Sequence, residues 1–497
     1  MRRLFCSGLL VLLSCASSAW AAEIASADLP PAQLSAEEES EVDAMVLPVP
    51  PAWVGDFDGM RELHRVRILV PYSKTFYMVD RGRQAGVAYE FGKALETWLN
   101  QHEPSAQKSQ RWQVMFLPTA RNELLPKLLA GEGDIAAGGL TITAGRERTV
   151  DFTNPALSNV NEVLITAPGS AKIERLEDLA GQEVYVRPSS SYFEHLVELN
   201  ERFKTQGLAA VKIMPANENL ETEDLLQMVN AGLFGITVAD QHIAQLWQPL
   251  YSDMRIHAGV PLHQGGEVSY ALRKNSPLLK QVLNAFTKEH KIGSEFGNIM
   301  LRRFKSSKRV LNATSEAEMR KFNGLVGLFE KHAGTYDFDH LMLMAQGFQE
   351  SQLNQAARSR AGAVGVMQLL PSTAADPAVG IKGVDTSVDK NIEAGSKYMR
   401  LLASKYLDDP ELTPVNRTLM SFAAYNAGPG NLMKFRRLAQ KSGLDPNIWF
   451  GNVEQAAARI VGRETVDYVG NIYKYYVVYK LAEQKLRERA KASQAGG

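Results

Sequence analysis

The chain has 497 residues, of which 45% are hydrophobic and 22% charged, a composition typical of a soluble globular protein rather than a fibrous or disordered one. At roughly 150 residues per domain, this length predicts two or three domains. The 55 lysines and arginines equal the 55 aspartates and glutamates in number, so no net positive charge favours binding to nucleic acid.

Residues 1–21 have the pattern of a secretory signal peptide. Arg2 and Arg3 precede an apolar run over residues 4–13, and Ala19-Trp20-Ala21 supplies small residues for cleavage. The apolar run is shorter than the roughly 20 residues that span a bilayer, and no other charge-free stretch is long enough. We therefore expect an exported protein without a membrane-spanning helix.

Both cysteines, Cys6 and Cys15, lie within this signal segment, so the exported protein has no thiol left for an internal disulfide. Residues 12–15, Leu-Leu-Ser-Cys, also resemble a lipoprotein cleavage box. Two outcomes therefore stay open. Either Cys15 is lipidated, or the chain is cleaved after Ala21 and Cys15 is a passive part of the signal.

Residues 22–64 are interpreted as a flexible tether. They combine Pro30-Pro31, an acidic run from Glu37 to Asp43, and further prolines at positions 48, 50 and 51, with little apolar periodicity. Such composition favours an extended, solvated segment.

Residues 65–305 are expected to form an α/β domain. Val66 to Val70 has the β-branched enrichment of a buried strand, and strand-like runs then alternate with helical patterns as far as Val238. After a linker at 306–317, residues 318–490 consist of helical patterns separated by Gly, Pro and Asn loops. We expect an all-α second domain.

Within the α/β domain, residues 124–152 read as a helix, a short strand and a glycine-rich exit. The pattern of Ile142, Thr143, Arg146 and Phe152 resembles the periplasmic amino-acid binding proteins, the solute-binding protein family 3. The resemblance covers roughly residues 65–304 and implies a bilobal periplasmic-binding-protein fold. It also implies that Arg146 holds a ligand carboxylate, for which a planar guanidinium is suited. Arg148 is the alternative.

The same resemblance implies further contacts with a small amino-acid-like or muropeptide ligand. Tyr77 would form an aromatic wall, and Gly139 and Thr141 would offer backbone and hydroxyl contacts. From the second lobe, Ser190 would donate a hydrogen bond from its amide, and Asp240 would bind the ligand ammonium group. The serine-rich residues 188–192 depart from the family's glycine-containing turn. Each key residue also has a plain structural alternative: a surface ion pair for Arg146, a helix N-cap for Asp240 and core packing for Tyr77.

In the second domain, Leu341, Met344, Ala345 and Phe348 recur at helical spacing and predict a buried helix. Glu350 lies near its end, and Gly347 one turn earlier is expected to leave room beside the carboxyl group. Burial disfavours the charged form and raises the pKa of a carboxyl group, which suits a general acid near neutral pH.

Four motifs support that role: Glu350-Ser351 with Ser359, Gly365-Val366-Met367-Gln368, Ala424-Tyr425-Asn426-Ala427-Gly428, and Tyr468-Val469. In this order they resemble the family 1 lytic transglycosylases of the goose-type lysozyme superfamily. A binding-protein domain followed by this one is similar to the membrane-bound lytic murein transglycosylase F family. The resemblance implies an all-α lysozyme-like fold, a peptidoglycan substrate and possible association with the inner face of the outer membrane.

The resemblance further implies cleavage of the β-1,4 bond between N-acetylmuramic acid and N-acetylglucosamine, leaving a 1,6-anhydro end. Glu350 would act first as acid and then as base, so no second carboxylate is needed, and Glu393 and Glu464 are expected to be structural. Core filling is the alternative for Met367. The residues expected to bind the sugars are Ser351, Ser359, Met367, Gln368, Tyr425, Asn426 and Tyr468.

The sequence contains no HExxH, GxSxG or Walker A motif, and its nine histidines are scattered. We therefore expect neither a cofactor nor a metal. The rival hypothesis is a ligand-sensing, cell-wall-binding protein whose lysozyme-like domain is weak or inactive. The intact Glu350 argues against that rival.

Overall fold

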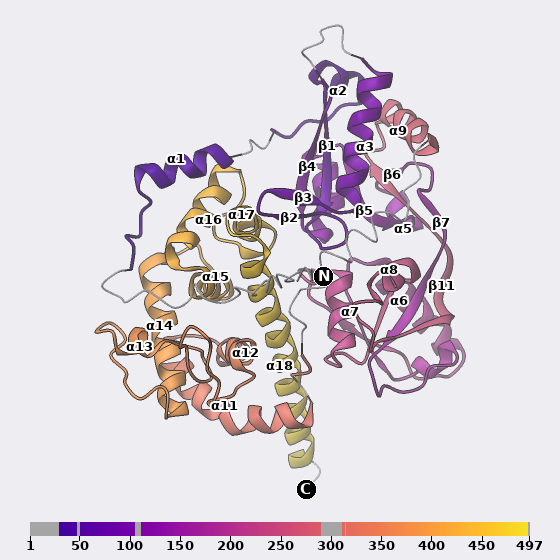
Figure 1. Cartoon of the computed structure of the whole chain (residues 1–497). Coiled ribbons are helices and arrows are strands. Elements are labelled where there is room, and N and C mark those ends of the chain that lie inside the picture. Colours follow the sequence, from indigo (N-terminus) through magenta and orange to yellow (C-terminus); the bar gives the residue numbers. More distant parts are fainter. Residues whose placement is uncertain (1–28, 47–49, 105–110, 290–310, 314, 496–497) are drawn as a thin grey trace, which may run out of the picture.

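The computed structural model describes residues 29–46, 50–104, 111–289, 311–313 and 315–495. The signal segment, both cysteines and the choice between Ala21 and Cys15 lie outside these residues. The described residues form a two-lobed α/β domain and a helical domain (Figure 1), as the sequence predicts. No helix among the described residues is both long and apolar enough to cross a membrane.

The first lobe is built on three parallel strands, β4 (Gln113–Thr119), β1 (Arg65–Pro71) and β5 (Ile135–Thr141). Six of the seven residues of β1 are buried, so a continuous apolar run packs on both faces of the sheet. Around this sheet lie α2 (Phe57–Leu63), α3 (Val87–His102), α4 (Leu124–Leu129), α5 (Ala144–Glu147), α9 (Pro277–Glu289), β6 (Asp151–Phe152) and the hairpin of β2 (Met78–Asp80) and β3 (Arg83–Ala85).

The second lobe contains the parallel strands β10 (Ile236–Asp240), β8 (Glu183–Val186) and β9 (Lys212–Pro215). Two long antiparallel strands, β7 (Leu157–Thr166) and β11 (Arg255–Leu272), run between the lobes and join their sheets in the order β4-β1-β5-β11-β7-β10-β8-β9. The helices of this lobe are α6 (Ser191–Thr205), α7 (Thr222–Asn230) and α8 (Gln241–Trp247).

The helical domain lies beside both lobes (Figure 1). Its longest helix, α18 (Arg463–Ala495), has 33 residues and is therefore about 50 Å long. It packs against α12, which carries Glu350, and against α15. The other helices are α11 (Glu316–Tyr336), α12 (His340–Ser351), α13 (Pro371–Ala375), α14 (Val388–Tyr406), α15 (Pro414–Ala427), α16 (Pro429–Lys441) and α17 (Glu454–Ile460).

The expected tether is not extended over its described length. Residues 36–45 form α1, which begins with a reciprocal Ser35–Glu38 capping box, and α2 follows further on. Helix α1 lies along α16 of the helical domain, with Val42 fully buried and Glu39 paired to Arg437 at 2.9 Å. The tether prediction was wrong here because acidic residues of this run pair with basic residues of a distant helix and Val42 packs against it, although Glu41 and Asp43 stay exposed.

Candidate active site and ligand site

Glu350 lies in the last turn of α12, which ends where Gln352 and Leu353 take positive φ. Its side chain is half-buried, and its Oε1 accepts a hydrogen bond of 2.6 Å from Tyr468 Oη of α18. Burial, followed by the charge of Glu350, raises the pKa of Tyr468 well above its usual value. Tyr468 therefore stays protonated and keeps a hydrogen to donate.

Three predicted sugar-binding residues help to shape the loop that follows α12. Ser351 Oγ donates to the carbonyl of Val366 at 2.8 Å, Ser359 Oγ accepts from the Ala363 amide at 2.9 Å, and Gln368 Nε2 donates to the Gly365 carbonyl at 2.9 Å. The Ser351 bond holds the loop against the end of α12, and the other two bonds brace the loop internally, so the three side chains have a structural role.

Glycines in this region are needed for packing. Gly365 has φ +79°, and a Cβ there would lie 2.3 Å from Asn391. A Cβ on Gly347 would lie 3.0 Å from atoms of Phe329 and Val366. Gly347 thus lets α12 pack closely on α11 and the loop, and the expectation that it leaves room beside the carboxyl group is corrected.

Tyr425 and Met367 are linked behind the acid. Tyr425 Oη donates to the Met367 carbonyl at 2.7 Å, and burial, with the charge of Glu350 second, raises the pKa of Tyr425 well above its usual value. The Met367 side chain is 0% exposed and lies against Gly395. The prediction that this side chain contacts sugar is therefore corrected to the core-filling alternative, because no part of it reaches the surface.

The remaining residues are placed as follows. Asn426 Oδ1 accepts a hydrogen bond of 2.8 Å from Thr465 Oγ1 of α18, which holds the end of α15 against that helix. Glu393 is hydrogen-bonded to Tyr336, and Glu464 is exposed in the first turn of α18. Glu393 therefore has a structural contact, whereas the structural role of Glu464 stays a prediction.

Sequence reasoning missed Gln346, which lies one turn before Glu350 on α12. Its side chain is 0% exposed, and its Nε2 lies 3.4 Å from Tyr468 Oη. The available signal was a polar residue within the run Leu341 to Phe348, which is otherwise apolar.

The second site is a cavity of about 230 Å³ between the two lobes of the N-terminal domain. Five of the six predicted ligand-binding residues line it: Gly139, Thr141, Arg146, Ser190 and Asp240.

The predicted aromatic wall is displaced by one residue. Tyr77 is 2% exposed, donates to Gln84 Oε1 at 2.9 Å and stacks on Phe116 in the core. Phe76 lines the cavity instead, next to Gly139, where a Cβ would come within 2.5 Å of its ring. The prediction for Tyr77 was therefore wrong, and core packing is the role that the structure gives it.

Arg146 joins the lobes across this cavity. Its Nη1 donates to the Thr141 carbonyl of the first lobe at 2.8 Å, and its Nη2 donates to the Ser189 carbonyl of the second lobe at 3.0 Å. Burial lowers the pKa of Arg146. Arg148, by contrast, is exposed, so the guanidinium that lines the cavity is that of Arg146.

Asp240 ends β10 and is 5% exposed, and its Oδ1 has no hydrogen-bond partner among the described residues. Burial, reinforced by the charge of Glu162, raises the pKa of Asp240 to about 7. Although Asp240 precedes α8, its side chain makes no capping hydrogen bond. Ser190 is the residue that caps a helix, because its Oγ accepts from the Phe193 amide at 3.3 Å.

The lobes are closed on each other. Arg121 of the first lobe pairs with Glu221 of the second at 2.8 Å, and the Thr75 amide donates to Glu223 Oε1 at 3.1 Å. Arg121 and Glu221 were not among the residues predicted from the sequence.

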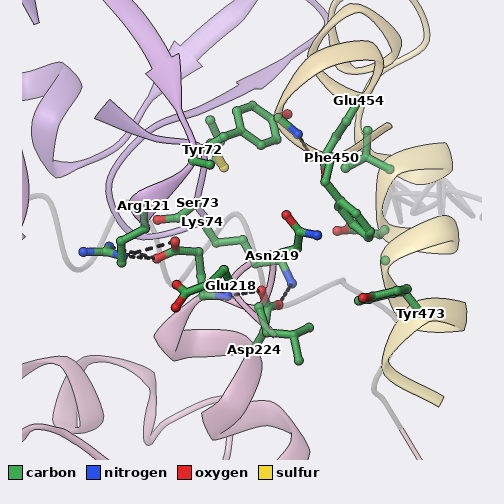
Figure 2. A pocket seen from close by; sticks show the side chains of 18 of the residues that line it. Tyr72, Ser73, Lys74, Arg121, Glu218, Asn219, Asp224, Phe450, Glu454 and Tyr473 are labelled. Atoms are coloured by element: carbon green, nitrogen blue, oxygen red, sulfur yellow. Dashed lines mark hydrogen bonds and ion pairs between the residues drawn. The ribbon is translucent and has the colours of Figure 1, made fainter. Parts of the chain in front are cut away.

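A smaller cavity of about 100 Å³ lies where both lobes meet the helical domain. Asp224 of the second lobe pairs with Lys474 of α18 at 2.8 Å and with Lys74 of the first lobe at 3.5 Å. Although burial alone would raise the pKa of Asp224, the two lysines hold it below its usual value. Figure 2 shows Lys74 and Asp224 facing Phe450, Glu454 and Tyr473 of the helical domain.

Residues 66–305 match the family model for bacterial extracellular solute-binding proteins, family 3, and residues 327–447 match the transglycosylase SLT domain. A Desulfosudis oleivorans protein named membrane-bound lytic murein transglycosylase F is 28% identical over 461 residues, covering 86% of this chain and 94% of that protein. A Saccharophagus degradans protein of the same name is 27% identical over 390 residues, covering 74% and 75%.

Among solved structures, an ancestral arginine-binding protein bound to arginine is 21% identical, with a TM-score of 0.38. It matches 48% of this chain and 97% of its own length.

Proposed function

We propose that this chain, which matches the transglycosylase SLT domain and the family 3 solute-binding proteins, cleaves peptidoglycan with formation of 1,6-anhydromuramyl ends under the influence of a bound ligand. The observation that supports the chemistry best is the hydrogen bond of 2.6 Å from Tyr468 to Glu350. It gives one carboxyl group a fixed orientation at the end of a buried helix.

In the proposed reaction, protonated Glu350 gives its proton to the oxygen that links N-acetylmuramic acid to N-acetylglucosamine. The C1–O4 bond breaks, and the C6 hydroxyl of the same muramyl residue bonds to C1. The Glu350 carboxylate then takes the hydroxyl proton, which restores the acid. Hydrolases that retain or invert configuration need a second carboxylate, but here the substrate supplies the nucleophile.

Zymography on murein and mass spectrometry of the products test this proposal. Wild-type protein should clear murein and release anhydro ends, and Glu350→Gln should do neither. Reducing-end products would instead indicate a hydrolase. Binding to murein without any clearing would favour the rival, a cell-wall-binding protein.

We propose that the interlobe cavity holds one free amino acid rather than a muropeptide. Its volume of about 230 Å³ lies below the ~300–1,000 Å³ of pockets for drug-sized ligands. Arg146 would face the carboxylate and Asp240 the ammonium group, since its Oδ1 lacks a partner among the described residues. Calorimetry with free amino acids and small muropeptides would distinguish the two ligand classes.

We propose further that α18 transmits the state of the lobes to the active site. Its Lys474 binds Asp224, which also contacts Lys74 of the other lobe, so opening of the lobes would alter the surroundings of this helix. Lys474→Met should therefore remove any effect of the ligand on turnover. Lys480→Met, an exposed position on the same helix, is the matched control and should keep that effect.

For localisation, we propose export to the periplasm, with attachment to the inner face of the outer membrane if Cys15 is acylated. The mass of the mature N-terminus distinguishes lipidated Cys15 from cleavage after Ala21.

A further inference from the structure

Gln346 places a primary amide inside the helical domain, one turn before the catalytic acid. It is 0% exposed, and its Oε1 has no hydrogen-bond partner among the described residues. A buried amide without its full set of hydrogen bonds costs stability, whereas an apolar side chain of the same length would pack there without that cost. A residue that weakens the core at this position requires another explanation.

The contact of Gln346 with Tyr468 determines how the phenol hydrogen is used. The Gln346 Nε2 group can only donate, so at 3.4 Å it makes Tyr468 Oη an acceptor. Tyr468 has one hydrogen, and its other neighbour is Glu350 Oε1 at 2.6 Å. The chain of hydrogen bonds therefore runs in one direction, from Gln346 to Tyr468 to Glu350.

We propose that Gln346 is a positioning residue for the acid, one that directs the Tyr468 hydroxyl hydrogen to Oε1 and so keeps the acid proton of Glu350 on Oε2. This inference rests on the proposed function. The carbonyl oxygen of a carboxylic acid is a better acceptor than its hydroxyl oxygen, so a hydrogen bond at Oε1 favours the acid proton on Oε2 and delivery of the proton from that oxygen.

The direction of the pH effect follows from the same contacts. A hydrogen bond donated to a carboxylate stabilises its charged form, and an amide that donates to Oη strengthens the donation by the phenol. Without the amide, the charged form of Glu350 loses stabilisation, and Glu350 keeps its proton to higher pH. The decline of activity on the alkaline side should therefore occur at a higher pH.

The test is the pH profile of kcat/KM for anhydro-product release by the full chain and by Gln346→Met. Methionine matches glutamine in length and removes the unpaired oxygen, so we expect a thermal midpoint equal to or above that of the wild type. The alkaline limb should move up by about half to one pH unit. Gln346→Leu provides a second apolar replacement, in which the same displacement is expected.

A double-mutant cycle with Tyr468→Phe identifies the route of the effect. If Gln346 acts through Tyr468, then Gln346→Met should move the limb only when the phenol is present. An unmoved limb in both Gln346 variants, with wild type and Glu350→Gln behaving as proposed, overturns the positioning role alone. Equal displacement with and without the phenol also overturns it. A wild type that releases no anhydro ends overturns the proposed function together with this inference.

Discussion

Lys474 and Tyr468 lie six residues apart on α18, and the two side chains contact different domains. Lys474 Nζ is 2.8 Å from Asp224 in the second lobe, whereas Tyr468 Oη is 2.6 Å from Glu350 in the candidate active site. Six residues of α-helix span about 9 Å. A single helix therefore connects a charge on the α/β domain to the proposed catalytic acid.

Replacing Glu350 with Gln should abolish lysis while leaving fold and murein binding intact. The amide keeps the shape of the side chain but has no acid proton to give. Zymography and a murein pull-down measure the two properties separately. Glu464→Gln, at an exposed position of α18, serves as control and should remain active. Substantial residual lysis by the Glu350→Gln variant would mean that another group supplies the proton.

The helical domain should fold and act when it is produced alone as residues 311–495. All four motifs, and the contact between Glu350 and Tyr468, lie inside this span. We expect a lower thermal midpoint than in the full chain, because the fragment loses α1 and leaves Lys474 without Asp224. Circular dichroism and zymography check the two statements. A folded fragment without activity would show that the N-terminal domain is required for catalysis.

Arg146→Ala and Asp240→Ala should each weaken ligand binding about 30-fold or more, because either change leaves one ligand charge unpaired in a closed cavity. Arg148→Ala should change affinity little, since Arg148 is exposed. Calorimetry with the amino acid that binds best to the wild type measures all three. A larger loss at Arg148 than at Arg146 would contradict the assignment of the pocket.

The raised pKa of Asp240 predicts how stability depends on pH. Burial, then the charge of Glu162, moves this pKa from 3.8 to about 7, so between these values the folded protein binds a proton that the unfolded chain releases. Stability is therefore lost as pH rises through this window. The free energy of unfolding of Asp240→Asn, relative to that of the wild type, should therefore rise by roughly 2–3 kcal/mol as the pH goes from 5 to 8.

Thermal unfolding at the two pH values measures this difference. Asp253→Asn, at an exposed position of the same domain, is the control and should show no such gain. An equal effect of Asp240→Asn at both pH values would mean that the Asp240 carboxyl group does not titrate between pH 5 and pH 8.

The order of strands and helices along the chain was enough to predict an α/β class and an all-α class, because buried parallel strands and amphipathic helices leave different periodicities. The two-lobed arrangement was implied only by the resemblance to solute-binding proteins. The motifs likewise led to Glu350, Arg146 and Asp240. They could not show the exposure of each matched residue. Met367 occupies the expected motif position, yet its side chain is 0% exposed.

Two other differences have physical causes that a linear pattern hides. Phe76 and Tyr77 are consecutive aromatic residues in a loop, where no period of two or 3.6 decides which side chain faces the cavity. The acidic run at Glu37 to Asp43 forms a helix because its basic partners are far away in the chain, on α16.

The position of helix α1 also affects the order in which parts of the protein can fold. Its contacts with α16 join residues 393 to 402 positions apart, such as Glu41 with Lys434 and Glu39 with Lys441. Residues 36–45 are synthesised long before residues 429–441, so α1 has no partner until most of the chain has been made. Such nonlocal contacts form late in folding. The helical domain is thus completed by a segment that precedes the α/β domain in the chain, and a deletion of residues 36–45 should lower the stability of the helical domain.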